Sequence, residues 1–344
     1  MQSSRVTLAD VARKAGVSRT AASFVLSGRT DMRIAAATRQ RVLDTAAELG
    51  YRPNLTARGL RTNVTGVIGL ISDTIATTPY AGEVIRGALD TAREHDRLVL
   101  VAETSDDHEI EHGLIQQMLD RSVDAFLYAS MFTQEREPPA LLRDYPVVLL
   151  NCMATSFSAP TVVPDEIRAG HTAARALLDA GHTDGIHVIG GRHDTVTTPG
   201  GVVAGRERMR GIETELRKAG TGPASVIECA WHVPDHGYRA VSDLLGERRP
   251  SALICMNDRL AFGVYQALQE HHLRVPEDVS VISFDDSDLA SWLRPALTSV
   301  ALPHYELGRT AVTLLTEPEH GRSLLRVPMP LRSRASVAPP ASFS

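Results

Sequence analysis

Apolar residues recur at helical spacing over roughly the first fifty positions of the chain and in short continuous runs after residue 65. The first helical stripe, with apolar residues three or four positions apart, consists of Leu8, Val11, Ala12 and Ala15. Thr7 precedes this stripe, and Asp10 follows Thr7 by three residues, a spacing typical of a capping box. We therefore predict a helix that begins after Thr7 and ends at Gly16.

Two further helices are predicted before residue 51. Ser18 is a suitable N-cap for a second helix that runs to about Leu26, and the turn at Gly16 and Val17 is as tight as a helix-turn-helix requires. A third helical stripe, closed by Gly50, is formed by Val42, Ala46 and Leu49. The front of the chain is therefore predicted to be an all-helical bundle that contains a helix-turn-helix.

After Thr65 short β-rich runs alternate with amphipathic helices, which is the pattern of parallel sheets with right-handed crossovers. The runs are Val67–Ile71, Leu98–Val101, Ala125–Tyr128, Val147–Leu150, Ile186–Ile189, Ala252–Cys255 and Val279–Phe284. About 280 residues and a Gly- and Pro-rich interruption at 197–201 favour two sheets over one. The tail from Pro328 has no leucine heptad, so no coiled-coil assembly element is expected.

The charge is divided unevenly between these two parts. The 344 residues are 43% apolar and 22% charged, as in soluble globular proteins, and carry a net charge of -5. Residues 1–62 hold eleven Lys or Arg against four Asp or Glu, a balance of +7, which leaves -12 for the remainder. We therefore predict a polyanionic partner for the front of the chain only.

Cysteine usage and hydropathy narrow the protein class further. Cys152, Cys229 and Cys255 are far apart and form no CxxC motif, so neither a disulfide framework nor a structural zinc site is predicted. No apolar run is long enough to cross a membrane, and the N-terminus has no apolar signal core. We expect a cytoplasmic protein without a membrane partner.

The second helix has the composition of a DNA-reading helix. If Ser18 caps it, the outward side of its first turns carries Arg19, Thr20, Ser23 and Phe24. The side toward the bundle then carries Ala22, Val25 and Leu26. A recognition helix presents its first turns to base edges in the major groove, so this helix is the candidate reader.

Three segments carry a family resemblance. They are Thr-Leu-Ala-Asp-Val-Ala-Arg-Lys-Ala-Gly-Val-Ser at 7–18, Thr-Arg-Gln-Arg-Val at 38–42 and Glu-Leu-Gly-Tyr-Arg-Pro-Asn at 48–54. The chain resembles the lactose/galactose repressor (LacI/GalR) family over nearly its whole length. This resemblance implies an α/β protein with a helix-turn-helix domain and a bilobal periplasmic-binding-protein-like body of two doubly wound parallel-sheet subdomains.

The resemblance also implies domain boundaries. The implied divisions are a DNA-binding domain at 1–53, a hinge at 54–64, a body at 65–344, a first subdomain at about 65–163 plus 293–325, and a second at about 164–292 plus 326–340.

In the family, matching positions read bases or hold phosphates. The base-reading positions fall on Arg19, Thr20 and Phe24, and the phosphate positions on Ser18, Ser23, Thr38 and Asn54. Phe24 departs from the arginine common there, and a phenyl ring touches a thymine methyl but cannot bond guanine O6 and N7. We therefore expect an altered base preference at that position. Ala35 likewise replaces a usual capping serine.

The segment from Asn54 to Thr62 is too short to form a stable isolated helix, and Gly59 weakens it by about 1 kcal/mol relative to alanine. In the family this hinge folds on the operator, and the residue matching Leu60 wedges into the minor groove from both protomers of a dimer. A plain flexible linker is the alternative.

Polar side chains follow the predicted strands of the body, at the edge where parallel sheets bind ligands. The resemblance implies effector contacts from Arg208, Asn257, Asp285 and Trp231, and more loosely from Tyr80 and Asp165. Amide, carboxylate and guanidinium groups match sugar hydroxyls, and an indole stacks on an apolar sugar face. A nucleoside fits this chemistry almost as well as a sugar.

Several of these residues have structural alternatives. Trp231 is equally consistent with a core position, Arg208 with a surface ion pair, and Asp258 is favoured as the cap of the following helix.

Catalytic functions are not supported. His108-Glu109-Ile110-Glu111-His112 matches the zinc-protease pattern H-E-x-x-H, but the predicted buried stripe of Ile110, Leu114 and Met118 turns both histidines toward solvent. Neither a phosphate-binding P-loop nor a G-x-S-x-G motif occurs, and the adjacent Asp285 and Asp286 do not straddle a bond as glycosidase carboxylates do. No catalytic residue, metal or cofactor is predicted, and the protein is not expected to be an enzyme.

We therefore expect a sequence-specific DNA-binding transcriptional regulator, a repressor in the first instance, whose operator affinity is set by a small polar effector, favoured to be a sugar. A homodimer on a pseudo-palindrome of about 14 to 20 base pairs is expected, joined through helices near Glu83–Arg93 and Arg259–Gln269. A solute-binding protein and a sugar-processing enzyme are the alternatives. The sequence leaves the effector's identity open, and with it the choice between inducer and co-repressor.

Overall fold

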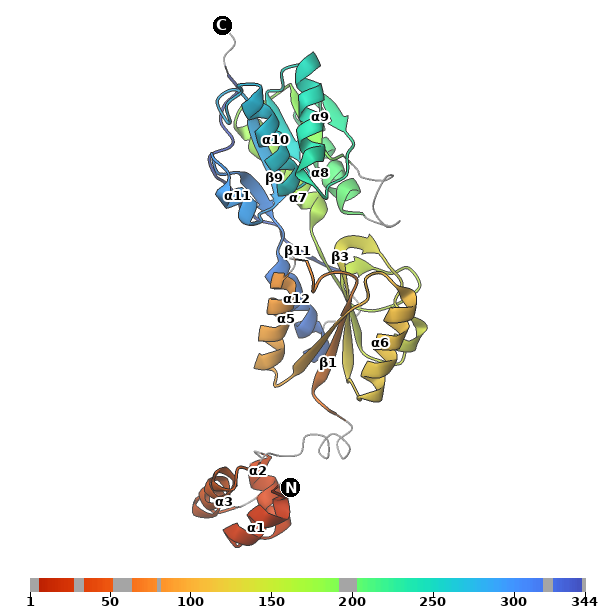
Figure 1. The fold of residues 1–344 in the computed structure, drawn as a ribbon, viewed down its shortest axis with the longest axis vertical. Helices are drawn as coiled ribbons and strands as arrows, with labels where there is room; N and C mark the ends of the chain where they lie inside the picture. Colours follow the sequence, from red (N-terminus) through yellow and green to blue (C-terminus); the bar gives the residue numbers. More distant parts are fainter. Residues whose placement is uncertain are drawn as a thin grey trace. The chain divides into compact units, whose positions relative to one another are not determined.

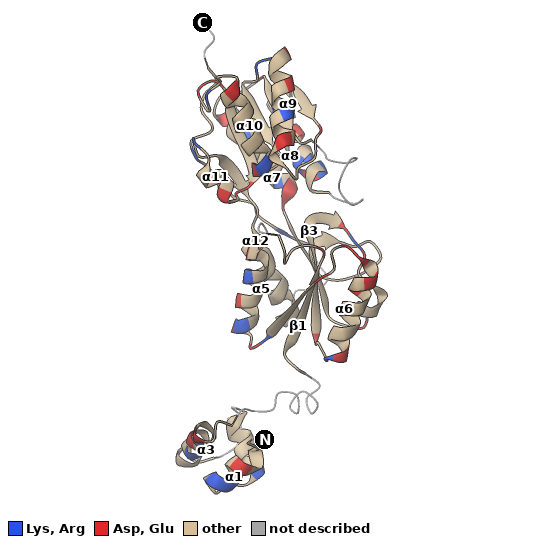
Figure 2. Cartoon of the chain, in the orientation of Figure 1, with Lys and Arg blue, Asp and Glu red and all other residues tan. Residues whose placement is uncertain are grey.

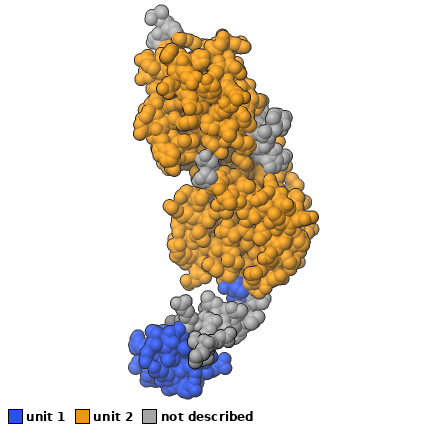
Figure 3. Space-filling model, in the orientation of Figure 1, with its two compact units in different colours: residues 1–65 blue, residues 66–344 orange. Residues whose placement is uncertain are grey.

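The computed structural model describes residues 6–27, 34–51, 64–78, 82–191, 203–317 and 324–341. The chain divides into two compact units at 1–65 and 66–344, shown in Figure 3. We refer to them as the head and the body. Among the described residues, no helix combines the length and the apolar character needed to traverse a bilayer.

The head is a three-helix bundle made of α1 (Leu8–Ala15), α2 (Arg19–Leu26) and α3 (Ala36–Glu48). The capping box of Thr7 and Asp10 is present, and Gly16 ends α1 in the left-handed conformation with φ of 66°. Ser18 caps α2, its hydroxyl accepting from the Ala21 N–H at 3.1 Å. These three sequence predictions are therefore confirmed.

The core of the head joins all three helices. Its buried members are Val11, Ala12, Ala15, Ala22, Val25, Val42 and Ala46. Ala35 stands at the N-cap of α3 and makes no side-chain capping bond, as its methyl group requires.

The first lobe of the body is built on a six-stranded parallel sheet with the order β11-β5-β4-β3-β1-β2. Its strands are β1 (Val67–Ser72), β2 (Leu98–Glu103), β3 (Ala125–Glu135), β4 (Val147–Met153), β5 (Thr161–Pro164) and β11 (Leu324–Val327). Its helices are α5 (Gly82–Glu94), α6 (His108–Asp120), η1 (Ala140–Leu142) and α12 (His304–Thr316). Figure 1 shows this sheet between α5 and α6.

The second lobe repeats this plan with the order β12-β10-β9-β8-β6-β7, in which only the short β12 runs antiparallel to its neighbour. Its strands are β6 (Ile186–Ile189), β7 (Ser225–Ile227), β8 (Ala252–Cys255), β9 (Ser280–Asp285), β10 (Thr298–Ala301) and β12 (Leu331–Arg332). Its helices are α7 (Glu166–Asp179), α8 (Ala204–Lys218), α9 (Pro234–Glu247), α10 (Asp258–Glu270) and α11 (Asp288–Trp292).

Both faces of the first sheet are covered by helices, which explains why its strands read as continuous apolar runs. Along β3, Leu127 and Ala129 pack into the cluster that includes α5 and α12 residues, whereas Phe126 and Tyr128 pack into the cluster that includes α6 residues. Successive side chains of a strand point to opposite faces, so a doubly covered strand has no polar face.

Glycines allow neighbouring helices of the body to approach at backbone distance. A Cβ atom on Gly170 of α7 would lie 2.1 Å from the Arg208 carbonyl oxygen of α8, and one on Gly211 of α8 would lie 2.1 Å from the Ile167 carbonyl oxygen. The α7–α8 pair thus closes through two glycines, which sets the position of Arg208 at the start of α8.

The two-sheet prediction is confirmed, and each of the seven predicted runs coincides with a strand, with Val279 alone falling one residue before its strand. The expected return to the first subdomain at residue 293 was wrong, because β10 still pairs with β9 in the second sheet. The chain crosses back after Ala301 and leaves the first lobe again after Val327. Five strands were not predicted, namely β5, β7, β10, β11 and β12.

The buried stripe predicted for α6 was also wrong in part. Its buried residues are Glu111, Ile115 and Met118, whereas Ile110 is 48% exposed. Glu111 is buried because its carboxylate accepts hydrogen bonds from Tyr128 and Arg136, a pairing that periodicity does not reveal. His108 and His112 are exposed, as expected.

Candidate functional site

A cavity of about 970 Å³ lies between the two lobes of the body. The first lobe contributes residues from the carboxyl-terminal parts of β3 and β4, and the second lobe contributes residues at the end of β9 and after β8 and β9. The crossover segments near Leu302 and Pro328 complete the wall. The cavity therefore occupies the carboxyl edges of both parallel sheets, where α/β folds bind ligands.

Arg208 lies at the centre of the second-lobe wall, with only 2% of its surface exposed. Its Nε donates to Glu166 Oε2 at 2.6 Å and its Nη2 to Glu166 Oε1 at 3.2 Å. Its Nη1 donates to the carbonyl oxygen of Met256 at 2.5 Å, and its Nη2 lies 3.5 Å from Asp285 Oδ1. The alternative of a surface ion pair was wrong, because this ion pair is buried.

Two aromatic rings flank the guanidinium. The Cζ atom of Arg208 lies 4.7 Å from the centroid of Phe284 and 5.5 Å from that of Trp231, both within cation–π range. Trp231 is 4% exposed and donates from Nε1 to the Gly190 carbonyl oxygen at 2.8 Å. It belongs to the core of the second lobe, as the structural alternative expected, and it also lines the cavity, so its contact with an effector stays a prediction.

Arg208 and its two acidic neighbours, Glu166 and Asp285, stabilise each other in their charged forms. Burial alone would lower the pKa of Arg208, but the neighbouring carboxylates of Glu166 and Asp285 raise it above its ordinary value. Burial raises the pKa of Glu166, and the guanidinium of Arg208 opposes that rise. The fork-shaped, two-bond contact is the geometry of a strong carboxylate–guanidinium pair.

Asn257 lines the cavity and also caps α10. Its Oδ1 accepts from the Leu260 N–H at 2.9 Å, and its Nδ2 donates to the Trp231 carbonyl oxygen at 3.0 Å. The cap favoured from the sequence, Asp258, is therefore wrong by one residue. The side chain of Asp258, 1% exposed, turns instead toward β9 and β10.

Asp258 anchors the loop that carries Asp285. Its carboxylate accepts from the hydroxyls of Ser283 and Ser299, and from the N–H and hydroxyl of Ser287 at 2.7 and 2.9 Å. Burial, followed by the charge of Asp285, raises the pKa of Asp258 to about 7. Asp285 itself has φ of 103°, a left-handed conformation that an L-residue adopts only when its surroundings hold it there.

Asp286 follows with φ of 53° and closes the same loop. Its Oδ1 accepts from Arg334 Nη2 at 2.5 Å, and its Oδ2 lies 3.6 Å from Arg332 Nε. Asp286 is therefore engaged with two guanidiniums, whereas Asp285 keeps 21% of its side chain exposed. Both acids line the cavity with similar exposure, 21% for Asp285 and 18% for Asp286, and Asp285 is the one beside Arg208.

Two looser predictions fare differently. Asp165 does not line the cavity: it is the N-cap of α7, where its Oδ1 accepts from the Arg168 N–H at 3.1 Å. The neighbouring Glu166 takes that place, because the helix start turns the next side chain inward toward Arg208. Tyr80 lies outside the described residues.

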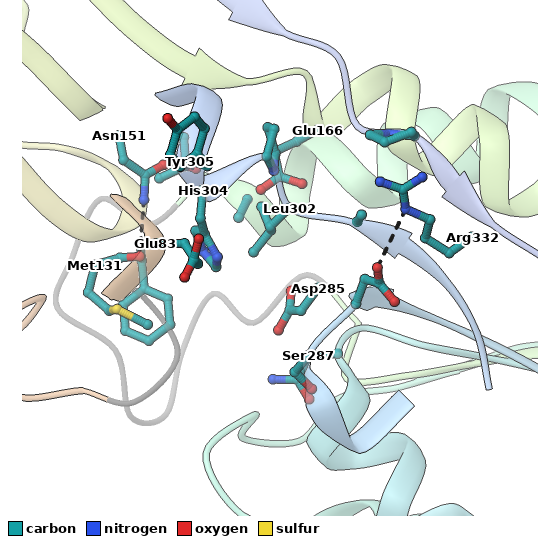
Figure 4. A pocket seen from close by; sticks show the side chains of 18 of the residues that line it. Glu83, Met131, Asn151, Glu166, Asp285, Ser287, Leu302, His304, Tyr305 and Arg332 are labelled. Atoms are coloured by element: carbon teal, nitrogen blue, oxygen red, sulfur yellow. Dashed lines mark hydrogen bonds and ion pairs between the residues drawn. The ribbon is translucent and has the colours of Figure 1, made fainter. Parts of the chain in front are cut away.

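The first lobe supplies wall residues that sequence reasoning missed (Figure 4). Asn151, with φ of 56°, donates from Nδ2 to the carbonyl oxygens of Ser130 and Met131 at 2.9 and 3.0 Å. Its Oδ1 accepts from the Thr133 hydroxyl at 2.7 Å. The sequence could have identified Asn151 as a cavity residue, since it directly follows the predicted apolar run Val147–Leu150. Asn257 stands two residues after the run Ala252–Cys255 in the same way.

Glu83 at the start of α5 and His304 at the start of α12 also line the cavity and were not predicted. Burial lowers the pKa of His304, and the charges of Asp285 and Glu83 oppose that lowering. A neutral imidazole at neutral pH is therefore favoured at this point of the wall. Neither residue follows a predicted strand, so sheet-edge reasoning did not point to them.

On the head, Ser18, Arg19 and Thr20 are exposed at the start of α2, while Ser23, Phe24 and Thr38 are half-buried. Figure 2 marks the basic and acidic positions of the helices. Asn54 and Leu60 lie outside the described residues. The described part of the chain contains no group of three or more His, Cys, Asp or Glu residues arranged to hold a metal ion.

A helix-turn-helix head and a two-lobed body with a polar cavity define the class of regulators that pair a DNA-binding domain with a ligand-binding domain. Residues 7–54 match the family of bacterial regulatory proteins of the lacI type, and residues 174–337 match the periplasmic binding protein-like domain. The chain belongs to the lacI family of transcriptional regulators.

Curated relatives cover almost the whole chain. Catabolite control protein A of Priestia megaterium is 33% identical over 315 residues, covering 91% of this chain and 92% of that protein. The transcriptional repressor PurR of Aliivibrio fischeri (strain ATCC 700601 / ES114) is 30% identical over 343 residues, covering 96% and 98%.

Solved structures share the fold. The lac repressor dimer bound to operator and an anti-inducer aligns with a TM-score of 0.78 at 23% identity, covering 97% of this chain and 99% of that one. The regulator CelR in complex with cellobiose aligns with a TM-score of 0.66 at 27% identity, covering 96% and 100%.

Proposed function

We propose that this protein is a sequence-specific transcriptional repressor that binds a pseudo-palindromic operator as a homodimer and changes its operator affinity when a small polar effector, a sugar in the first instance, enters the cavity. The observation that carries this proposal is the convergence of Arg208, Trp231, Asn257 and Asp285 on one cavity between two lobes. The resulting activity is regulation of transcription rather than catalysis.

The head supports the DNA-binding half of the proposal. The capped start of α2 exposes Arg19 and Thr20, which places a guanidinium and a hydroxyl where a recognition helix reads base edges. The first 62 residues carry a balance of +7, suited to a polyanion. We assign base contacts to Arg19, Thr20 and Phe24.

The phosphate contacts are assigned to Ser18, Ser23, Thr38 and Asn54, and the minor-groove wedge to Leu60.

The cavity supports the effector half. An amide, a partly exposed carboxylate and an indole edge suit a polyhydroxylated ligand, and 970 Å³ accommodates a mono- or disaccharide. Solved neighbours agree in chemistry: CelR holds cellobiose, and an Enterococcus faecium regulator, 25% identical with a TM-score of 0.62, holds ribose.

The body offers surfaces for a dimer. β2 is an edge strand of the first sheet, yet it exposes 58% of Leu98 and 39% of Val101. An uncovered apolar edge strand pairs readily with another chain. We therefore place the dimer contact along β2 together with α5 and α10, the two helices expected from the sequence.

The chain segments that cross between the two lobes can couple the effector cavity to operator binding. A ligand that contacts both lobes favours one lobe arrangement, and in a dimer that arrangement sets the spacing of the two heads. Ligand and operator must then change each other's affinity by the same factor.

Selection of genomic fragments by the purified full-length protein, followed by gel shift, tests DNA recognition. We expect a half-site palindrome and a steep loss of affinity with salt, because phosphate contacts release counterions. A flat salt dependence, or no preference over random DNA, would contradict the proposal. A thermal-shift screen of sugars and nucleosides, repeated with operator present, then tests effector control.

Two head variants refine the assignment. Leu60→Ala should weaken operator binding while sparing non-specific binding, and an equal loss on both would remove the wedge role. Phe24→Arg should shift the preferred base toward guanine at one symmetric operator position, since arginine bonds guanine O6 and N7. Phe24→Leu is the matched control, which should not create that preference.

A further inference from the structure

Arg208 is the only fully buried guanidinium lining the cavity among the described residues, and its hydrogen-bonding edge is already occupied. The edge formed by Nε and Nη2, which an arginine uses to grip a ligand carboxylate or phosphate, is taken by the two oxygens of Glu166. Nη1 is engaged by the Met256 carbonyl oxygen. The faces of the guanidinium are flanked by Phe284 and Trp231.

Carboxylates outnumber guanidiniums along the lining, although Asp286 and Glu306 are also paired with Arg334 and Arg309, which lie outside it. The lining holds six carboxylates and three guanidiniums, namely Glu83, Glu166, Asp285, Asp286, Asp288 and Glu306 against Arg208, Arg259 and Arg332. Figure 4 shows Glu83, Glu166 and Asp285 around the same space, the first from one lobe and the other two from the other. An anion that approaches Arg208 would meet the like charge of Asp285 and Glu166.

The exposed fractions decide which partner a ligand meets first. The side chain of Asp285 is 21% exposed, whereas those of Arg208 and Glu166 are 3% and 1% exposed. A carboxylate accepts hydrogen bonds and donates none, so its complement is a hydroxyl or an ammonium group. The wall beside Arg208 thus presents an acceptor where an anionic ligand would need donors, whereas the 58% exposed guanidinium of Arg332 lies beside Asp286 instead.

Building on the proposed function, we propose that Glu166 determines effector specificity by occupying Arg208, so that the cavity accepts a neutral or amine-bearing polyol and rejects phosphorylated or carboxylated ones. Glu166 acts as a built-in substitute for the anion that Arg208 would otherwise bind. Removing its charge while keeping its shape should convert the cavity into an anion site.

Inorganic phosphate is a probe for this conversion that requires no knowledge of the effector. Titration calorimetry and thermal shift are run on the full-length protein, with chloride at equal ionic strength as reference. We expect phosphate binding to Glu166→Gln to be saturable and at least about tenfold tighter than any binding to the wild type. The binding should vanish in Glu166→Gln combined with Arg208→Met. Glu247→Gln is the control, because it removes the same charge at an exposed position of α9 outside the cavity wall.

Saturable phosphate binding by the wild type that Arg208→Met abolishes would overturn the proposal. So would a folded Glu166→Gln, verified by circular dichroism, that ignores phosphate.

A second measurement needs no variant and so does not depend on folding of Glu166→Gln. Glucose, glucosamine, glucuronate and glucose 6-phosphate are compared on the wild type at equal concentration. A stronger response to either anionic hexose than to glucose overturns the inference, whereas a response confined to glucose or glucosamine supports it. Operator binding is measured on the same samples, so that failure of this inference can be told from failure of the proposed function. If the operator still binds but an anionic hexose is preferred, only this inference is refuted. If the operator does not bind, the proposed function is refuted.

Discussion

Each lobe of the body buries an arginine among carboxylates at the carboxyl edge of its sheet, but only one of these arginines lines the cavity. In the first lobe, Arg136 donates from Nε to the Tyr128 hydroxyl at 2.7 Å and from Nη2 to Glu111 Oε1 at 2.9 Å. In the second lobe, Arg208 uses the same two nitrogens, but both donate to the carboxylate of Glu166. Both lobes thus pair an arginine with carboxylates, but only the pair in the second lobe lies in the cavity wall.

The acids around Arg136 and those around Arg208 differ in the groups that they contact. In the first lobe, Asp73 Oδ2 lies 3.7 Å from Arg136 Nη1. The Asp73 carboxylate also accepts from the Met131 N–H at 2.9 and 3.1 Å and from Gln134, and so fixes the irregular part of β3 that forms cavity wall. In the second lobe, Asp285 keeps an exposed edge toward the cavity. Arg136 and its acids therefore stabilise the cavity wall without lining it, whereas Arg208, Glu166 and Asp285 line the cavity themselves.

The largest expected effect comes from Arg208→Ala. It leaves Glu166 buried without a counter-charge, which should cost about 3 to 5 kcal/mol of unfolding free energy in urea titration, and it should abolish the response to any effector found by thermal shift. The double variant Glu166→Gln with Arg208→Met removes both charges and should recover part of that stability. A loss below about 1 kcal/mol would refute the buried-pair description.

Arg136→Ala should destabilise the protein somewhat less, by about 3 kcal/mol, because the side chain of Arg136 is 11% exposed and water can reach part of the cluster. Effector selectivity between neutral and anionic ligands should persist, as the Arg208 cluster is untouched. Comparison of the ligand profile of this variant with that of Arg208→Ala distinguishes residues that stabilise the cavity wall from residues that recognise the effector. Loss of selectivity here would erase the distinction between the lobes.

Asp258 gives the second lobe a pH dependence. Its pKa, raised to about 7 from 3.8, means that the folded state holds the proton more tightly than the unfolded chain. Stability from this group is fully present below its unfolded pKa and is lost as the pH rises through about 7, with a slope of at most about 1.4 kcal/mol per pH unit. Urea titrations from about pH 5 to about pH 8 should show this slope flattened in Asp258→Asn. The exposed-site control Asp243→Asn should retain it.

The smallest effect is expected for Tyr128→Phe. The lost hydroxyl donates to Glu111 at 2.8 Å and accepts from Arg136, but the direct contact between Arg136 and Glu111 remains. Unfolding free energy should fall by about 1 kcal/mol, the value of one hydrogen bond. A cost near that of Arg136→Ala would show that the hydroxyl, rather than the charge pair, organises the first-lobe cluster.

Sequence reasoning performed best where local chemistry dictates structure. The capping box at Thr7, the left-handed Gly16 and the Ser18 cap depend on neighbours within a few residues, and each is present. The apolar runs of the central strands were also visible, since a strand covered on both faces must be apolar throughout. The short edge strands β7 and β12, with two or three half-buried or exposed residues, lack such a signal.

The cavity was predictable only in part. Arg208, Trp231, Asn257 and Asp285 do meet at one cavity, while Asp165 is displaced by its neighbour Glu166, and Glu83, Asn151 and His304 were missed. Asp165 and Glu166 are adjacent acids at a helix start, and the sequence offers no reason to prefer one as the cap. The packing of α7 against α8 at Gly170 and Gly211 makes that choice.

The sequence by itself determined the order of domains, the basic head and the helix-turn-helix, because these depend on composition, periodicity and contacts close along the chain. The tertiary structure alone decided that Arg208 is paired with Glu166, forty-two residues away, and that Asp258 holds the loop of Asp285. The physical reason is that the pairing of buried charges is set by which backbones approach one another, and that approach is decided by packing across the whole lobe.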